Sequence, residues 1–597
     1  MKKILPLIFF ALLVFGAYAP ALRDDFVWDD TALILRDPLI RSPRLIAEGF
    51  QHFLFTDATA SDFYRPIQRL TYTLDYAAFA LRPAAYHCAS IAWHLAATIA
   101  LFFFALEFFQ VIGVDRRIAR VVAIASTALW AIHPVHTSAV AYISGRADSL
   151  AAAFGFAALW LGLRSLRMSG ARFWVGTIAS AVLLLLSALS KELGLIFLAL
   201  WLTILLAQKN WRAARAAIVA VIFVLAAYWS LRAPAEHILP PTHSPIPALV
   251  RPVLVARAFA EYAGLLVFPI NLHMERDVET RPTGFTPQSA TNSAWRELQT
   301  LAGILIFGAF VYWIFRERRR DRAVFLLLIL TLVAYLPVSG MIGLNATVAE
   351  HWLYLPSAFL FLALGLWLAR FLKTAPNFLR PLTISALTLW AIFLGGRTFA
   401  RTLDWKDQRT FLERTIAQGG DSARMLINLA SLEIKEDHPE KAKALLFAAL
   451  KKEPDQPLAI LDLAAIAVKE KDYSTAHQLL ARAKDMPLVE AQAYELMTIL
   501  ESKERGKANL LRMRLASRSG PSNWAIEKRY VKLLDELGDR EGAIRELQGC
   551  LVTQWYRADS WQLLGVLLAR AGRGPEAAAA FARAHLYDVH LVPDPAS

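Results

Sequence analysis

Apolar runs of membrane-spanning length constrain this chain more than any other feature of its sequence. The first run, Ile4–Leu22, follows Lys2 and Lys3 and is long enough to cross a bilayer as a helix. Hydrophobic residues make up 56% of the 597 positions, which is too many for a soluble protein and favours a polytopic membrane protein. Because cytoplasmic loops carry an excess of lysine and arginine, we expect the N-terminus in the cytoplasm and the residues after Leu22 on the opposite side.

Eleven such runs can be placed so that every short loop assigned to the cytoplasm is basic. The expected spans are 4–22, 86–109, 121–135, 149–166, 173–189, 193–207, 213–231, 298–315, 323–336, 353–371 and 382–395. The odd number puts the two termini on opposite sides. The apolar stretch 253–272 is interrupted by Arg257 and Glu261, so we predict that it lies at the interface or re-enters the membrane. The alternative of a full span stays open.

The C-terminal third of the sequence has no spanning runs, more charge and an internal repeat. Alanines recur about every 34 residues, at Ala442, Ala476, Ala508, Ala543 and Ala577. The last unit, with Gly565 and Phe581, resembles a tetratricopeptide repeat, whose helices touch through small residues. Such units stack because one alone cannot bury its apolar face. We predict a membrane domain at 1–400, a linker at 401–420 and an α-solenoid at 421–597.

Charge and cysteine usage exclude two other classes. The net charge is +14, but the arginines separate apolar runs and form no basic stripe on a soluble domain, so no nucleic-acid partner is expected. Cys88 and Cys550 lie in different regions and offer neither a disulfide framework nor a metal motif. The expected fold class is all-α.

Two adjacent carboxylates, Asp29 and Asp30, follow the first run on its outer side. Carboxylates at a lipid–water boundary can take up a proton or hold a cation. The structural alternative is that Asp30 caps a helix beginning at Thr31. The pair alone leaves both interpretations open.

Other charged and imidazole groups gather at span ends on the same outer side. They are Arg65, His133, His136, Arg146, Asp148, Lys191, Glu192, Glu350 and His351. Such groups are costly near a membrane unless they are paired or functional. Together with the carboxylate pair, this concentration on one side favours a functional site. The alternatives are a loop salt bridge for Arg65, an ion pair between Arg146 and Asp148, and a turn anchored by Lys191 and Glu192.

These residues lie in motifs that resemble a known family. In chain order the motifs are FVWDD at 26–30, YRP at 64–66, YH at 86–87, AIHPVHTSAV at 131–140, GRAD at 145–148, SKE at 190–192, VAEHWLYLPS at 348–357 and DW at 404–405. The set resembles the TMTC family of transmembrane and tetratricopeptide-repeat protein O-mannosyltransferases, within the GT-C glycosyltransferases, over essentially the whole chain. One departure is His351, where the family usually carries arginine, and the repeats are fewer than in animal members.

The resemblance implies a GT-C bundle of about eleven transmembrane helices followed by an extracytoplasmic tetratricopeptide solenoid. Segment 23–85 is then the first external loop, which carries the acidic motif, and 232–297 an external loop with the interfacial segment. The implied partners are membrane lipid, a polyprenyl-phosphate sugar and an acceptor protein or peptide. By resemblance the sugar is mannose, and it is transferred to Ser or Thr of the acceptor. The repeats are one place where the acceptor could bind. A bacterial inner-membrane relative with a periplasmic site is expected; in a eukaryote the membrane would be that of the endoplasmic reticulum.

The resemblance also assigns roles to residues. Asp29 and Asp30 occupy the family's essential acidic position; we favour Asp29 as the base and Asp30 for positioning, and the reverse stays open. One-step attack would invert the anomeric carbon. Candidates for binding the donor phosphate are Arg65, His133, His136, Arg146, Lys191, Glu350 and His351, with Asp148, Glu192 and Tyr354 in support. No cofactor or metal site is predicted, and a divalent cation bridging carboxylate and phosphate stays open.

Three rival functions differ from this prediction. A non-enzymatic scaffold would use the spans only to anchor a peptide-binding solenoid. A transporter would need broken helices near mid-membrane, whereas the polar residues here lie at span ends. An envelope glycan or lipid is the alternative acceptor.

Overall fold

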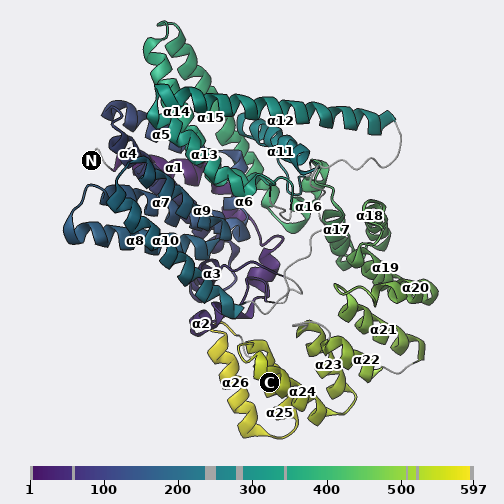
Figure 1. The fold of residues 1–597 in the computed structure, drawn as a ribbon. Helices are drawn as coiled ribbons and strands as arrows, with labels where there is room; N and C mark the ends of the chain where they lie inside the picture. The colour runs from purple at the N-terminus through teal and green to yellow at the C-terminus, as the bar shows by residue number, and fades with distance from the viewer. Residues whose placement is uncertain are drawn as a thin grey trace.

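The computed structural model describes residues 4–56, 61–235, 250–276, 278, 287–341, 346–505, 509–518 and 524–591, without the side chains of 287–293 and 505. All regular secondary structure in these residues is helical (Figure 1). The one β-type contact among them is an isolated bridge between Arg276 and Val348. The all-α class expected from the sequence is confirmed.

The N-terminal two thirds form a bundle of long helices. They are α1 (Leu5–Tyr18), α4 (Pro83–Ile112), α5 (Arg116–Ala131), α7 (Arg146–Ser165), α8 (Gly170–Ser190), α9 (Ile196–Ala207), α10 (Trp211–Arg232), α11 (Arg251–Val267), α12 (Pro287–Arg320), α13 (Arg322–Tyr335), α14 (Tyr354–Thr374) and α15 (Leu379–Thr402). Glycines let α7 approach its neighbour closely, because a Cβ at Gly155 would meet the Phe197 ring and one at Gly162 the Trp201 indole. Close approach through small residues is how membrane helices pack.

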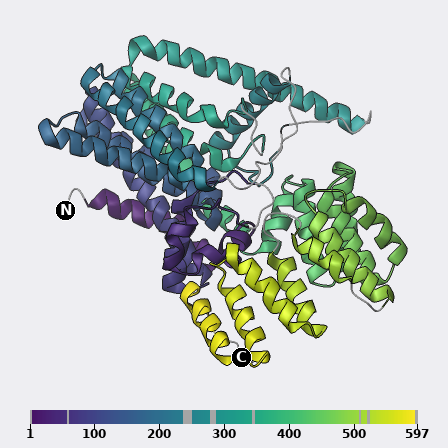
Figure 2. The ribbon, with the colours of Figure 1, turned by 60° about the horizontal axis from the view of Figure 1, so that its bottom comes forward.

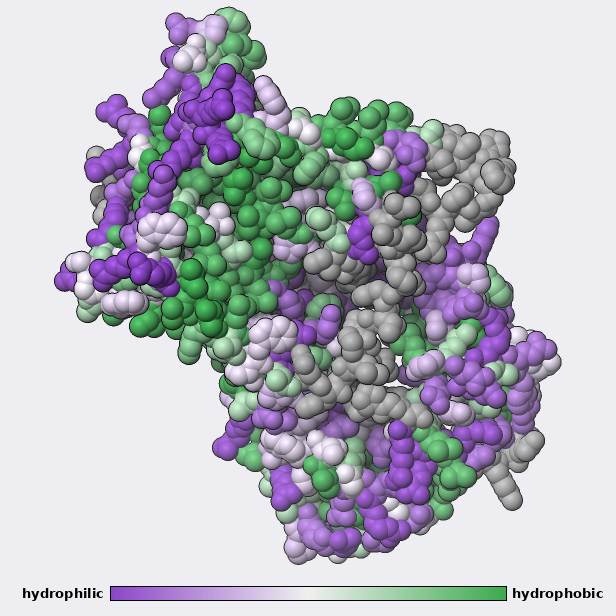
Figure 3. All heavy atoms as spheres, viewed as in Figure 1, coloured by the Kyte–Doolittle hydropathy of each residue, from purple (hydrophilic) through white to green (hydrophobic). Residues whose placement is uncertain are grey.

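The predicted number of spans is not confirmed. Within the described ranges, seven helices are long and apolar enough to cross a membrane, or eight if Arg116–Ala131 and Pro134–Val140, which meet at 55°, form one broken span. Two further apolar helices, Glu192–Ala207 and Arg322–Val338, are shorter. Hydrophobic residues cover much of this part of the surface, whereas the C-terminal part is mainly hydrophilic (Figure 3).

Helix α11 covers most of the stretch 253–272, for which a full span stayed open as an alternative. It is not among these candidate spans. Its two internal charges are paired within the fold. Arg257 contacts Glu297 at 2.9 Å, and Glu261 forms an ion pair with Arg276. Paired charges of this kind fit an interfacial helix, which stays a prediction.

The first loop folds into a compact unit of short helices rather than an extended connection. Its elements are η1 (Ala19–Arg23), η2 (Thr31–Leu35), η3 (Pro38–Ile40), η4 (Pro43–Leu45), α2 (Ile46–Gly49) and α3 (Pro66–Phe79). The buried Arg69 holds them together: its guanidinium contacts the Asp37 carboxylate at 3.0 Å and donates to the carbonyls of Gly49 and Leu54 at 2.7 and 2.8 Å.

The C-terminal part is a curved row of helices. They are α16 (Gln408–Ala417), α17 (Ala423–Lys435), α18 (Pro439–Lys452), α19 (Pro457–Glu470), α20 (Tyr473–Ala483), α21 (Glu490–Arg505), α22 (Leu510–Arg518), α23 (Trp524–Glu536), α24 (Arg540–Thr553), α25 (Ala558–Arg570) and α26 (Gly574–Tyr587). From α17 onward, each helix packs against the next one along the chain. The expected linker, 401–420, is largely helical.

The alanine repeat corresponds to contacts between these helices. Ala442, Ala476, Ala543 and Ala577 are buried, and Ala508 lies outside the described residues. A Cβ at Gly565 would collide with the Phe581 ring, which explains the small residue there. These features fit tetratricopeptide repeats, an assignment that stays a prediction.

The row of helices begins and ends against the first loop, as Figures 1 and 2 show. At its start, the Trp28 backbone N–H donates to Gln408 Oε1 at 2.7 Å. At its end, the Tyr76 hydroxyl donates to Asp588 Oδ1 at 2.7 Å, and the Ser42 hydroxyl donates to the Leu586 carbonyl at 3.1 Å. The helices therefore enclose a space beside the end of the bundle that carries Asp29 and Asp30.

Candidate active site

A strained turn presents the carboxylate pair. Trp28 has φ 56°, a conformation that side chains other than glycine rarely adopt. Three contacts hold it there: the hydrogen bond to Gln408, an edge-to-face contact with Phe411 at 5.6 Å, and the Arg424 guanidinium 5.4 Å from the ring centre. Strain of this kind persists only where surrounding contacts enforce it, so the C-terminal helices fix the position of the next residue, Asp29.

The two adjacent carboxylates have different environments. Asp30 is fully buried and sits at the N-cap position just before η2, but its side chain makes no capping bond. Oδ1 accepts from the Ser144 backbone at 2.8 Å and from the Ser144 hydroxyl, and Oδ2 accepts from the Val27 N–H at 3.2 Å. The helix-cap interpretation is therefore wrong: Asp30 ties the first loop to the turn at Ser144. Burial raises its pKa to about 7, against these hydrogen bonds.

Asp29 is only partly buried and lines a cavity. Its backbone N–H donates to the Tyr142 hydroxyl at 3.2 Å. Burial raises the pKa of Asp29 above its ordinary value, while a hydrogen bond from Tyr142 and the positive charges of Arg424 and Arg65 act in the opposite direction. The geometry thus gives Asp29 access to a substrate and leaves Asp30 a positioning role.

The cavity beside Asp29 has a volume of about 420 Å³ and opens to solvent. Three elements contribute cations to its wall. The Lys191 amine contacts Asp148 at 2.7 Å, and the Arg65 guanidinium contacts Glu192 at 2.9 Å. The third cation is Arg424, from α17. The predicted group of Asp29, Arg65, Lys191, His351, Asp148 and Glu192 is brought together on this wall.

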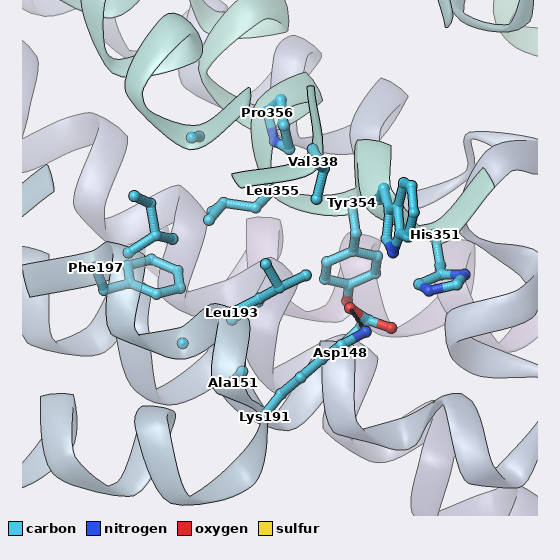
Figure 4. A pocket seen from close by; sticks show the side chains of 15 residues that line it. Asp148, Ala151, Lys191, Leu193, Phe197, Val338, His351, Tyr354, Leu355 and Pro356 are labelled. Atoms are coloured by element: carbon cyan, nitrogen blue, oxygen red, sulfur yellow. Dashed lines mark hydrogen bonds and ion pairs between the residues drawn. The ribbon is translucent and has the colours of Figure 1, made fainter. Parts of the chain in front are cut away.

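A smaller, mostly apolar pocket with an accessible volume of about 30 Å³ adjoins the cavity. The two share Asp148, Lys191 and His351. In Figure 4 the Lys191 side chain reaches toward Asp148, while Leu193, Phe197 and Leu355 line the other part. Pro356 also borders an apolar void of about 220 Å³ between α11 and α15. An apolar chain could lie here with its charged end at Lys191.

Arg146, a predicted phosphate ligand, does not reach the cavity. It is fully buried, and its guanidinium contacts Asp75 at 2.5 Å and donates to the Tyr86 carbonyl at 2.7 Å. The expected alternative pair with Asp148 is also wrong, because Asp148 pairs with Lys191. Arg146 instead fastens α7 to α3 and α4.

The two histidines and Tyr354 lie inside the helix bundle. His133 Nε2 is 3.0 Å from the Leu266 carbonyl, and His136 Nδ1 is 2.8 Å from the Trp130 carbonyl. Tyr354 contacts His94 Nδ1 at 2.6 Å. None of the three lines the cavity at Asp29 as the structure describes it, so the geometry supports packing roles for the two histidines. Tyr354 lines the smaller adjoining pocket (Figure 4).

Glu350 belongs to a separate buried cluster. Its carboxylate lies 3.5 Å from Arg401 and 3.9 Å from Arg276, and Arg401 also contacts Asp404 at 2.9 Å. Beside Asp404, the Trp405 ring stacks on Tyr142 at 5.0 Å. This cluster joins the turn at Glu350 to the end of α15, and it supports the cavity wall without lining it.

Comparisons with known proteins agree on one type of relative. No protein-family model matches the chain. The chain is 26% identical to Caenorhabditis elegans protein O-mannosyl-transferase F38B6.6 over 451 residues, which cover 73% of this chain and 61% of the relative. It is 33% identical to mouse protein O-mannosyl-transferase TMTC1 over 175 residues, 28% of this chain and 18% of the relative. It is 30% identical to Drosophila melanogaster Tmtc1 over 184 residues, 30% and 20% of the two chains.

The curated homologues of this chain are TMTC-type protein O-mannosyl-transferases. The chain spans about three fifths of the length of the nematode relative. Together with the seven candidate spans, the similarity to these TMTC-type proteins indicates a multi-pass membrane protein.

Sequence reasoning missed three residues that line the cavity or hold its carboxylates: Tyr142, Ser144 and Arg424. Tyr142 and Ser144 lie between two motifs that it used, and their link to Asp29 and Asp30 depends on a turn that no spacing rule encodes. Arg424 comes from the repeat region, where one arginine among many charged residues carries no local signal. Only the fold brings these three beside the first loop.

Metal-ligating groups do not gather at the cavity in the described part of the chain. Among the described residues, the cluster with a spacing that suits a metal ion is Glu433, Glu436 and His438, on α17 and the turn after it, away from the cavity wall. Arg409 pairs with both of these glutamates, at 2.7 and 2.6 Å. The cluster is therefore explained by ion pairing.

Proposed function

We propose that this chain is a membrane glycosyltransferase that moves a mannosyl group from a polyprenyl-phosphate carrier to a Ser or Thr hydroxyl of a protein. One observation carries the proposal: an accessible Asp29 carboxylate shares a cavity with three cations, and an apolar pocket adjoins that cavity. The names of the TMTC-type relatives supply the sugar and the protein acceptor. We propose the side opposite the cytoplasm for the reaction, the periplasm in a bacterium or the lumen of the endoplasmic reticulum in a eukaryote.

The donor would be held at both of its ends. The prenyl chain would lie along the two apolar voids that meet at Pro356, with its phosphate at Lys191. Arg65 and Arg424 line the same cavity as Lys191. Arginine grips phosphate through two parallel hydrogen bonds. Cations aimed at the leaving phosphate stabilise the charge that develops as the sugar departs.

The reaction needs one base and one leaving group. Asp29 takes the proton of the acceptor hydroxyl while the hydroxyl oxygen bonds to the anomeric carbon. The bond from that carbon to the phosphate oxygen breaks, and the electron pair leaves with polyprenyl phosphate. The anomeric configuration inverts. A raised pKa strengthens Asp29 as a base, while Asp30 holds the turn in place.

A divalent cation remains the second mechanistic candidate. The cavity wall carries four carboxylates, Asp29, Asp62, Asp148 and Glu192, against three cations. A metal ion between Asp29 and the donor phosphate would balance this excess. Transfer that survives EDTA supports the protein's own cations, and transfer restored by Mg²⁺ or Mn²⁺ supports the metal.

The test uses purified protein in lipid vesicles with radiolabelled polyprenyl-phosphate mannose and membrane extract as acceptor. We expect label in protease-sensitive product from wild type and from Asp25→Asn, an exposed carboxylate in the same loop, but none from Asp29→Asn. Label in protease-resistant glycan or lipid would support the alternative acceptor. Equal labelling by Asp29→Asn, or none by wild type, would leave the membrane-anchored scaffold as the better account.

A further inference from the structure

A second groove lies between the first loop and the curved row of C-terminal helices. It is open to solvent and has a volume of about 870 Å³. Ala32, Leu35 and Arg36 line one wall, and Ala525 and Arg529 of α23 line the other. The contacts of α26 with the first loop hold the two walls together (Figure 2). The groove is therefore a built channel and not an accidental gap between two surfaces.

The groove lies next to the cavity at Asp29. Phe55 lines both. The single helical turn η2 separates them, with Leu33 facing the cavity and its neighbours Ala32 and Leu35 facing the groove. A molecule lying in the groove is thus separated from the cavity of the proposed base by η2 and borders it at Phe55.

The chemistry of the groove suits a polypeptide. Its wall carries four arginines, Arg36, Arg41, Arg529 and Arg557, against two aspartates, Asp559 and Asp588. Because Arg529 is paired with Glu495 outside the wall, the surplus is one positive charge. The exposed Arg36 guanidinium and the Gln492 amide can donate to backbone carbonyls. The surplus positive charge attracts acidic side chains, which a neutral glycan lacks. The polar wall also excludes a prenyl chain.

An aromatic group stiffens the outer wall. The Trp524 indole N–H donates to Asp559 Oδ2 at 2.6 Å, and the Arg557 guanidinium lies 5.8 Å from the ring centre. Trp524 is buried, so these contacts fix the polar groups before a ligand arrives. Such pre-organisation lowers the entropic cost of binding.

We propose that this groove binds an extended, acidic segment of the acceptor polypeptide and leads its Ser or Thr residues to Asp29. The proposal rests on the proposed function for its choice of acceptor. It assigns to the C-terminal helices the task of selecting the acceptor, separately from donor binding on the membrane side.

The test fills the groove without removing any contact. Ala525 is exposed on the groove wall, and Ala448 of α18 is exposed and lines neither the groove nor the cavity. We compare Ala525→Trp with Ala448→Trp in the full-length protein in lipid nanodiscs. The probe is a fluorescent library of 15-residue peptides rich in Ser, Thr, Asp and Glu, and a matched library carries Lys in place of the acids. Fluorescence anisotropy measures binding, and the labelled-donor assay measures transfer.

We expect the acidic library to bind wild type, Ala448→Trp and Asp29→Asn equally, and Ala525→Trp at least tenfold more weakly. Arg36→Glu, a change at an exposed position, should weaken binding of the acidic library and favour the lysine library. Equal binding by Ala525→Trp and Ala448→Trp, or no binding of either library to wild type, would overturn the groove proposal even if Asp29 proves essential for transfer. Binding that depends on Ala525, with no transfer by any variant, would uphold the groove and refute the transferase.

Discussion

Two charge clusters in this protein, the wall of the cavity at Asp29 and the group around Glu350, are built from the same kinds of residue but differ in access. In the cavity, Lys191 and Arg65 each pair with one carboxylate beside an open void. Around Glu350, Arg401 is 1% exposed and contacts two carboxylates. The first group can exchange a protein partner for a ligand, whereas the second has no room for one.

This difference shows what charged motifs at span ends can mean. Burial of an ion pair costs several kcal/mol of desolvation, about as much as the pairing returns. The Glu350 cluster thus adds little net stability, yet removing one of its members leaves another charge buried and uncompensated. The cavity groups bear a smaller desolvation cost and can bind an anion. The predictions below test this division, starting with the largest effect.

The base at the cavity should be the most sensitive position for catalysis. We expect Asp29→Asn to lower the turnover number about 10²- to 10⁴-fold, the usual contribution of a general base, with an unchanged thermal unfolding midpoint. Asp30→Ala should instead lower the midpoint, because the buried N–H groups of Ser144 and Val27 lose their acceptor, at about 1–3 kcal/mol each. Turnover and thermal unfolding measured on both variants check this, and a matching loss of stability in Asp29→Asn would contradict it.

The Glu350 cluster should behave as a structural unit. We expect Arg401→Met to destabilise the fold by about 3–5 kcal/mol, the usual cost of breaking a buried ion pair. The double variant Glu350→Gln/Arg401→Met should recover part of that loss. The control is Arg409→Met, a more exposed arginine in an ion-pair network, where about 1 kcal/mol or less is expected. Thermal unfolding in detergent measures the stability of all three variants. A double variant less stable than Arg401→Met would contradict the structural role of the cluster.

The lysine of the cavity should act on the donor. We expect Lys191→Gln to raise the KM for polyprenyl-phosphate mannose about 10- to 100-fold, since a hydrogen bond to a charged group contributes about 1.5–3 kcal/mol. Lys406→Gln, an exposed lysine outside the cavity wall, is the control and should leave KM unchanged. Steady-state kinetics with varied donor distinguishes the two. An unchanged KM for Lys191→Gln would mean that the lysine only holds Asp148.

The smallest effect concerns the pH dependence of the base. Asp29 accepts a proton only when ionised, so turnover falls as the pH drops through its pKa. Burial raises that pKa and the Arg424 charge lowers it. Arg424→Gln should therefore move the acid limb of the turnover number to higher pH, by up to about one unit, while Arg424→Lys keeps the limb in place. A pH profile from about 4 to 8 checks this, and a shift to lower pH would contradict it.

The sequence predicted the helical class, the change of character near residue 420 and much of the cavity wall, because hydropathy and charge placement are local properties. It could not separate Glu350 from its neighbour His351, since one faces a closed cluster and the other an open void. It also placed Arg146 at the site, because a sequence does not show whether a charged residue is enclosed by protein partners or faces an open void. The predicted number of spans is not confirmed, because several apolar runs, such as α9 and α13, fold as helices too short to satisfy a length criterion.

The contribution of the C-terminal helices to the site lay beyond sequence reasoning. Arg424, Gln408 and Phe411 act on Trp28 only because the row of helices returns to the first loop. Contacts between segments so distant in the chain have no local signature. The repeat pattern could indicate stacked helices, but not the surface on which they dock.

The most direct test of the account is the single-turnover rate of sugar transfer in Asp29→Asn and Glu350→Gln, measured side by side and corrected for the folded fraction of each. The two residues lie in similar motifs and differ chiefly in access to the cavity. We predict at least a 100-fold lower rate constant for Asp29→Asn and a rate constant within about threefold of wild type for folded Glu350→Gln, a change below about 1 kcal/mol. Equal losses in the two variants, or a larger loss in Glu350→Gln, would contradict the assignment of the active site to the cavity at Asp29.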